Sequence, residues 1–193
     1  PTGANQAPAA NDGDDPFLAR PGNEAARQNL FRRVTTLERN LRQQIIGQDE
    51  AIGSLVRAVK KAAVGLKRPT NPVGTFLLVG RTGTGKTELA KSMARSLFDD
   101  PSAMIRVDCS EYALPHEYAK LIGSPPGYIG HNEGGFLTEA IKKKPNSVVL
   151  FDEVEKAHYK VHNLLLQLLD EGIITDSKGQ TVQFHQALIL MTS

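Results

Sequence analysis

TFLLVGRTGTGKT, residues 75–87, is the stretch that decides the fold, because it joins a short apolar run to a glycine-rich loop. The run at 75–80 is continuous, as expected of a strand that is buried on both faces of a sheet. The loop at 80–87 matches the pattern G-x-x-x-x-G-K-[ST] at every specified position. A helical pattern starts at Lys86 and continues to about Leu97. This order of strand, loop and helix predicts an α/β fold.

The glycine-rich loop has the chemistry of a phosphate-binding loop. Glycines let main-chain N–H groups turn toward phosphate oxygens without a Cβ in the way, and the N-terminus of the following helix attracts the same anion. We expect Lys86 to reach the β- and γ-phosphates of ATP and the Thr87 hydroxyl to bind Mg²⁺. A glycine-rich turn without a ligand is the alternative. The predicted nucleotide-binding residues here are Gly80, Arg81, Thr82, Gly83, Thr84, Gly85, Lys86, Thr87 and Glu88.

Two acidic residues follow a second apolar run. SVVLFDE, residues 147–153, predicts a buried strand that ends in Asp152 and Glu153. Asp152 can hold Mg²⁺, and Glu153 is expected to orient and polarise an attacking water molecule, which favours an NTPase over a kinase. Because open α/β sheets bind ligands at the carboxyl ends of their strands, this pair and the loop should meet at one edge. Two acids that merely end a strand are the alternative.

The rest of the chain supports a parallel sheet with helices on both faces, the three-layer sandwich of P-loop NTPases. Further apolar runs predict strands at 103–110 and 187–193, and two short strands around Lys178-Gly179 predict a hairpin. Helical patterns precede the first strand and follow the acidic pair. Leu30, Val34, Leu37 and Leu41 share one helical face, and further helices are expected at about 48–64 and within 161–172.

Composition limits the function classes only loosely. The 193 residues suit one domain, and the net charge of +2 argues neither for nor against nucleic acid. The single cysteine, Cys109, excludes an internal disulfide and predicts a buried filler. No apolar stretch is long enough for a transmembrane helix, so we expect a cytoplasmic protein without a membrane partner.

Residues 1–22 are rich in Pro, Ala, Gly, Asn and Asp and predict a flexible linker. Residues 23–193 predict the domain.

Several stretches resemble AAA+ proteins of the Clp/ClpB type, as in ClpA, ClpB and ClpC. The resemblance covers about residues 38–193 and is to the large subdomain of the second ATPase ring, truncated just before a sensor asparagine. It rests on IIGQDEAI (45–52), GRTGTGKTELAK (80–91), GSPPGYIGHNEGG (123–135), LTEAIKKKPNSVVLFDEVEKAH (137–158) and LLLQLLDEGIITDSKGQTVQF (164–184).

The resemblance implies roles for further residues. Ile45 and Ile46 would contact adenine, and Lys86 and Glu153 would be catalytic. The segment GYIG would be a loop in the pore of a hexameric ring, where an aromatic ring grips polypeptide of any sequence; its residues are Gly127, Tyr128, Ile129 and Gly130. More weakly, the hairpin at 175–182 resembles a second pore loop.

The resemblance also implies a protein unfoldase or disaggregase that acts on unfolded or tagged polypeptides. A nucleic-acid motor or loader is one alternative, but the loop at 127–135 is not basic, so no nucleic-acid partner is expected. A nucleotide-binding assembly module without turnover is another. A peptidase partner is left open. Because the family's arginine finger and helical lid would lie beyond Ser193, we expect the isolated chain to bind nucleotide weakly and to hydrolyse it slowly or not at all.

Overall fold

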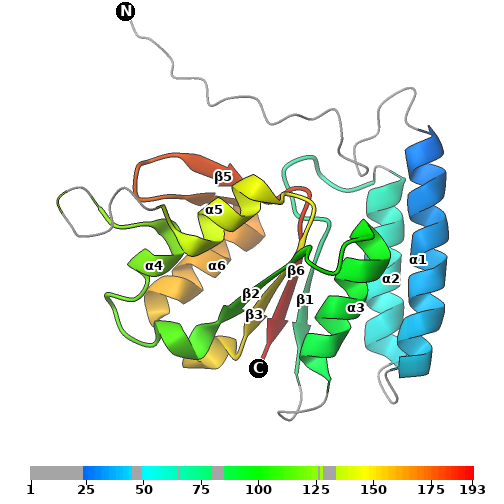
Figure 1. Ribbon diagram of the computed structural model, residues 1–193, viewed down its shortest axis with the longest axis horizontal. Coiled ribbons are helices and arrows are strands. Elements are labelled where there is room, and N and C mark those ends of the chain that lie inside the picture. The colour runs from blue at the N-terminus through cyan, green and yellow to red at the C-terminus, as the bar shows by residue number, and fades with distance from the viewer. Residues whose placement is uncertain (1–23, 45–48, 65, 80–84, 126, 128–133) are drawn as a thin grey trace, which may run out of the picture.

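The computed structural model describes residues 24–44, 49–64, 66–79, 85–125, 127 and 134–193 (Figure 1). Several predicted features lie outside these ranges: the linker at 1–22, Ile45, Ile46, the loop residues 80–84 and residues 128–130. The elements, with η for 3₁₀ helices, are α1 (Glu24–Gln44), α2 (Asp49–Ala63), β1 (Gly74–Leu78), α3 (Lys86–Phe98), β2 (Met104–Asp108), η2 (Cys109–Tyr112), α4 (Ala119–Ile122), α5 (Phe136–Lys143), β3 (Val148–Asp152), η3 (Val154–Lys156), α6 (Tyr159–Glu171), β4 (Ile173–Thr175), β5 (Thr181–Gln183) and β6 (Leu188–Thr192).

Four parallel strands form the main sheet in the order β1-β6-β3-β2. The last strand in sequence, β6, therefore lies between β1 and β3, and Leu190 stands beside Phe76 on one side and Leu150 on the other. Every connection between these strands passes through helices, as parallel pairing requires. The predicted hairpin is confirmed as the antiparallel pair of β4 and β5. The parallel α/β class is likewise confirmed.

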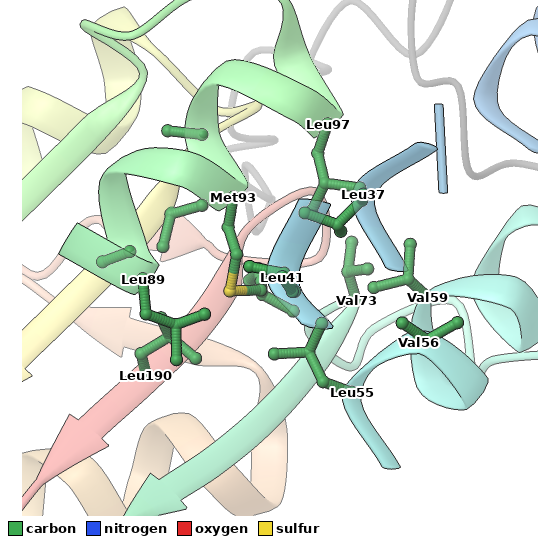
Figure 2. Packing of buried hydrophobic residues seen from close by; sticks show 14 of the residues in the cluster. Leu37, Leu41, Leu55, Val56, Val59, Val73, Leu89, Met93, Leu97 and Leu190 are labelled. Carbon is green, nitrogen blue, oxygen red and sulfur yellow. The ribbon is translucent and has the colours of Figure 1, made fainter. Parts of the chain in front are cut away.

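Side chains alternate between the two faces of the sheet, as the geometry of a strand dictates. In β3, Val148 and Leu150 pack in one apolar cluster with α1, α2 and α3, whereas Val149 and Phe151 pack in a second with α5, α6 and the hairpin. Figure 2 shows the first cluster, in which side chains from α1, α2 and α3 meet Leu190. These two cores make the predicted three-layer sandwich.

The first helix packs as its spacing predicts. Val34, Leu37 and Leu41 are fully buried against α2 and α3. Burying one such leucine stabilises the fold by about 1.5 to 3 kcal/mol. The same helix presents polar side chains outward, and Glu38 pairs with Arg42 on α1 and with Lys60 on α2. In the described part of the chain, every helix is too short or too polar to span a bilayer.

The prediction that the run at 75–80 is buried on both faces is wrong. Strand β1 lies at one end of the strand order, and its side chains contribute to the first cluster but not, among the described residues, to the second. Leu77 therefore remains 54% exposed and Val79, just past the strand, 72% exposed. An apolar run alone cannot distinguish a central strand from an edge strand whose second face is uncovered.

The end of one strand and one short helix also differ from the sequence prediction. The strand predicted at 103–110 ends at Asp108, because the Asp108 carboxylate accepts hydrogen bonds from the main-chain N–H and the hydroxyl of Ser110, which starts the 3₁₀ helix η2. No residue range was predicted for helix α5. Its signal is short: Leu137 and Ile141 stand four residues apart and both are buried in the second cluster.

Candidate functional site

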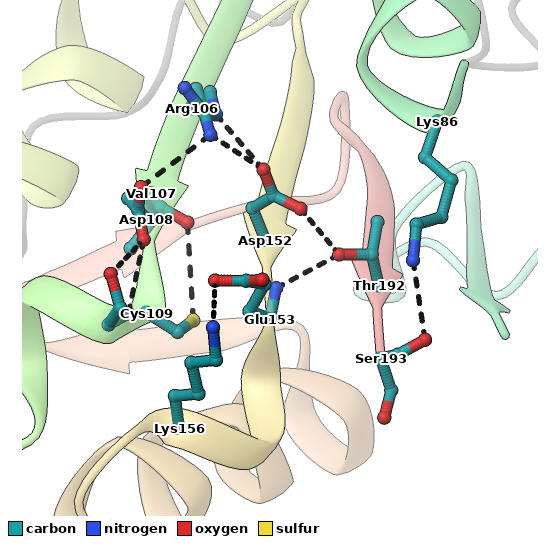
Figure 3. A network of polar contacts seen from close by, with 11 residues as sticks. Lys86, Arg106, Val107, Asp108, Cys109, Asp152, Glu153, Lys156, Thr192 and Ser193 are labelled. Carbon is teal, nitrogen blue, oxygen red and sulfur yellow. Dashed lines mark hydrogen bonds and ion pairs between the residues drawn. The ribbon is translucent and has the colours of Figure 1, made fainter. Parts of the chain in front are cut away.

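Helix α3 begins at the lysine of the glycine-rich loop. Gly85, just before it, has a left-handed backbone with φ of 83° and gives no side-chain cap to the first turn. The first N–H groups of the helix are thus left for an anion or water. Lys86 Nζ donates a hydrogen bond to the Ser193 carbonyl oxygen at 3.3 Å (Figure 3). The Thr87 side chain in the same turn is half-buried and Glu88 is exposed.

The acidic pair lies at the end of β3, where the backbone changes direction. Asp152 is the last strand residue, and Glu153 has a left-handed backbone with φ of 56° and ψ of 54°. A residue with a Cβ rarely adopts this conformation, and such strain is concentrated at functional sites. The Glu153 carboxylate accepts a hydrogen bond from Lys156 Nζ at 2.8 Å, one turn further along η3.

Thr192 at the end of β6 connects both acids. Its hydroxyl donates to Asp152 Oδ1 at 2.6 Å and accepts from the main-chain N–H of Glu153 at 2.9 Å. The Thr192 residue is fully buried, so this pair of bonds is shielded from water. Figure 3 shows the hydroxyl between the two acids on the neighbouring strand. The bonds fix the orientation of the Asp152 carboxylate and the turn at Glu153.

Arg106 on β2 holds the other oxygen of Asp152. Its Nη2 lies 2.7 Å and its Nε 3.2 Å from Asp152 Oδ2, while Asp108 Oδ2 lies 3.5 Å from the same Nη2. Burial would raise the pKa of Asp152. The hydrogen bonds from Thr192 and Arg106 and the charges of Arg106 and Lys86 outweigh burial and lower that pKa below its usual range. Asp152 is therefore a carboxylate at neutral pH.

The predicted partners lie at one edge of the sheet. Lys86 and Asp152 are bonded to consecutive residues at the end of β6, Ser193 and Thr192, and the positive charge of Lys86 acts on Asp152. Gly80 to Thr84, which should complete the loop, lie outside the described residues. The prediction that loop and acids surround one nucleotide is consistent with this placement of Lys86 and remains a prediction.

The donor set at this edge fits Mg²⁺ bound with a nucleotide. Mg²⁺ is usually held in proteins by one or two oxygen ligands together with phosphates and water, and a hydroxyl at Thr87 and a carboxylate at Asp152 are oxygen ligands of that kind. Protein side chains alone do not form a metal site in the described part of the chain, because no three His, Cys, Asp or Glu side chains gather there to hold a metal ion.

The predicted pore segment begins at Gly127, whose φ of 88° is left-handed; the next three residues of that segment lie outside the described residues. Its flanks are tied to the hairpin. The Ser177 N–H donates to the Ile122 carbonyl at 3.1 Å, and Lys142 on α5 pairs with the buried carboxylate of Asp176 at 3.3 Å. The chain on both sides of the predicted pore segment is therefore bonded to the hairpin.

Three residues around the acids were not singled out from the sequence: Arg106, Lys156 and Thr192. A signal for one of them exists, because each of three parallel strands ends in a polar residue after an apolar run: Asp108, Asp152 and Thr192. Polar residues at the carboxyl ends of parallel strands meet at the ligand-binding edge. Arg106 and Lys156 offer no such pattern.

Comparison with known proteins agrees with this fold. Residues 71–193 match the family model of the AAA domain (Cdc48 subfamily), and the chain belongs to this family. It is 52% identical over 161 residues to the ATP-dependent Clp protease ATP-binding subunit ClpC of Staphylococcus aureus, which covers 83% of this chain and 20% of that protein. It is 56% identical over 157 residues to the chaperone protein ClpB of Bacteroides thetaiotaomicron, covering 81% of this chain and 18% of that protein.

The resemblance to the Clp type of AAA+ protein is thereby confirmed. The chain spans about one fifth of the length of these relatives.

Proposed function

We propose that this chain is the ATP-binding and ATP-hydrolysing core of a Clp-type AAA+ unfoldase or disaggregase. In this proposal the full-length protein works as a hexameric ring and threads unfolded or tagged polypeptide through its pore. The observation that carries it is the shared position of Lys86 and the pair Asp152–Glu153, on either side of the end of β6. The names of the relatives, an ATP-binding subunit and a chaperone, support the same class.

Binding would use the start of α3 and the end of β3. Lys86 would contact the β- and γ-phosphates, and main-chain N–H groups of the loop and of the first turn would surround the phosphate oxygens. The Thr87 hydroxyl and the Asp152 carboxylate would hold Mg²⁺, which supplies neutralisation of phosphate charge when bound. Ile45 and Ile46 would provide the apolar contact for adenine.

Hydrolysis would depend on Glu153. Its carboxylate would accept a hydrogen bond from the attacking water and polarise it toward the γ-phosphate. In the structure Lys156 pairs with Oε2 of that carboxylate at 2.8 Å, so a water molecule that uses the same oxygen would displace Lys156. Because Lys156 is exposed, breaking its ion pair with Glu153 requires little free energy; surface ion pairs contribute only about 0 to 1 kcal/mol.

Transport of polypeptide would depend on the segment 127–130. Tyr128 would grip the extended chain through its ring, which offers contact area to any sequence. The ties of Ile122 to Ser177 and of Lys142 to Asp176 support a common movement of this segment and the hairpin.

The hydrolytic part is tested by Glu153→Gln in the full-length protein, with Glu155→Gln as the matched control. Glu155 is two residues further on and exposed. We expect Glu153→Gln to retain bound ATP and to lose hydrolysis by about a hundredfold or more, since a general base contributes a factor of this order. Glu155→Gln should hydrolyse ATP normally. Equal rates for the two variants would exclude Glu153 as the base.

The transport part is tested by Tyr128→Ala in the same protein. We expect ATP hydrolysis to continue while unfolding of a tagged substrate stops. Tyr128→Phe, which retains the ring, should unfold the substrate. If Tyr128→Ala unfolds it as well, the pore assignment is wrong, and the ATPase assignment stands or falls separately with Glu153.

A further inference from the structure

Both carboxylate oxygens of Asp152 already have protein partners. Oδ1 accepts the Thr192 hydroxyl, and Oδ2 accepts two nitrogens of Arg106, at 2.7 and 3.2 Å. The Asp152 side chain is only 14% exposed, whereas that of Arg106 is 46% exposed. The buried threonine holds one oxygen of the carboxylate, and the long, half-exposed arginine holds the other.

A cation at Oδ2 and the guanidinium at its present position would compete for the same carboxylate oxygen. Mg²⁺ binds carboxylate oxygens at about 2.0 to 2.1 Å, so a metal there would lie within a few ångströms of the Arg106 charge. Like charges at such a distance repel strongly in a partly buried site. Thr192 poses no such conflict, because a neutral hydroxyl on Oδ1 leaves the charge of Asp152 available.

Arg106 has a second partner within reach. Asp108 Oδ2 lies 3.5 Å from Nη2, and the Asp108 carboxylate is fixed through its other oxygen by Ser110. The negative charge of Glu111 also acts on Arg106. The guanidinium can therefore leave Asp152 for Asp108 by side-chain rotation alone, without becoming an unpaired charge.

We propose that Arg106 is a positioning residue that holds Oδ2 of Asp152 and moves to Asp108 when Mg²⁺ binds at that oxygen. This inference rests on the proposed function, since it assigns Asp152 to the metal. Arg106 keeps the Asp152 carboxylate oriented between turnovers. It also competes with Mg²⁺ for Oδ2, and so lowers the affinity of the site for the metal.

The first test measures the affinity of a fluorescent ADP for the full-length protein in Mg²⁺ and in EDTA. The ratio of these affinities reports how far the metal aids binding. We expect Arg106→Gln to increase the ratio about tenfold, because the metal no longer displaces a charge-assisted pair. Arg106→Lys, which keeps the charge but not the two-nitrogen contact, should lie between. Arg57→Gln is the control: Arg57 is exposed on α2 and bonds to Ser54 in the same helix.

The second test uses Mg²⁺ alone and no nucleotide. With Arg106 removed, Asp108 and Asp152 lose the cation between them, so the unfolding temperature of Arg106→Gln should rise on addition of Mg²⁺. The wild type and Arg57→Gln should respond little. In the background of Asp152→Asn, Arg106→Gln should change neither this response nor the ADP ratio, since the arginine acts through Asp152.

The results of these tests distinguish failure of the inference about Arg106 from failure of the proposed function. If wild-type ADP affinity is the same in Mg²⁺ and EDTA, the assignment of Asp152 to the metal fails, and the inference fails with it. If the wild type responds to Mg²⁺ and Arg106→Gln responds equally, Arg106 is a fixed structural partner of Asp152. The proposed function then stands and the inference is overturned.

Discussion

Thr192 and Asp152 are joined by a 2.6 Å hydrogen bond between neighbouring strands, from the threonine hydroxyl to the carboxylate. The same hydroxyl accepts the Glu153 N–H. One buried side chain of β6 thus sets the geometry of Asp152 at the end of β3 and of Glu153 just after it. The bond couples the end of the sheet that would bind metal to the turn that would present the base.

Removing this hydroxyl should affect both stability and turnover. Thr192→Val preserves the shape but leaves the Glu153 N–H and the Asp152 oxygen without their partner, which should cost about 1 to 3 kcal/mol in urea unfolding. ATP hydrolysis by the full-length protein should fall about tenfold or more, because the acids lose their orientation. Thr192→Ser retains the hydroxyl and serves as the control. If the valine and serine variants behave alike, the hydroxyl has no such role.

The backbone at Glu153 gives a second prediction. Glu153→Ala and Glu153→Gly both lose the carboxylate and the Lys156 pair, but only glycine adopts a φ of 56° without steric conflict. The glycine variant should be the more stable of the two by about 1 kcal/mol in urea unfolding. Both should be inactive in hydrolysis. A more stable alanine variant would show that Glu153 is not strained in solution.

Two glycines with similar backbones should respond differently to alanine. At Gly172, which ends α6 with φ of 70°, a Cβ would lie 1.9 Å from the Thr70 carbonyl oxygen. At Gly179 in the hairpin turn φ is 75° and no atom lies within 4 Å of such a Cβ. Gly179→Ala should cost about 1 kcal/mol from the backbone alone, and Gly172→Ala about 3 kcal/mol or more, because the loop at Thr70 must also move. Equal losses in urea unfolding would contradict this contact.

Cys109 should be unreactive in the folded chain. Burial, and to a smaller degree nearby acids such as Asp108, raises the pKa of its thiol from 9.0 to about 12. At pH 8 the thiolate fraction is then about one in ten thousand, and alkylation should be at least about a hundredfold slower than in the urea-unfolded chain. Because the chain has one cysteine, labelling reports on this thiol alone. Equal labelling rates would place Cys109 at the surface.

The raised pKa of Cys109 also predicts how the stability of the folded chain changes with pH. The unfolded chain ionises Cys109 above about pH 9 while the folded chain does not. The contribution of this group to stability is therefore present below pH 9 and is lost as the pH rises toward 12. A Cys109→Ala variant should lack this part of the alkaline loss in urea unfolding. The control is the wild type at neutral pH, where the thiol is neutral in both states.

Much of the fold could be predicted from the sequence because its signals are local. Apolar runs such as 147–153 and the helical spacing of Val34, Leu37 and Leu41 specify elements without knowledge of their neighbours. Whether a run is central or at an edge depends on which strands pair, so the exposure of Leu77 could not be predicted. At the site, Lys86 and the acids belong to recognisable motifs. Arg106 comes to Asp152 from β2 only after the sheet forms, and no spacing in the sequence indicates it.

The place of β6 in the strand order has a consequence for synthesis of the chain. Among the described strands, β1 pairs only with β6, and β6 ends at Thr192, more than a hundred residues later. While a ribosome is still making the intervening residues, β1 has no strand of this sheet with which to pair. Its apolar side chains therefore remain incompletely packed until β6 is synthesised. Such long-range pairing slows folding and exposes unpaired strands to aggregation. A nascent form of this domain should therefore itself depend on chaperones until its last strand emerges.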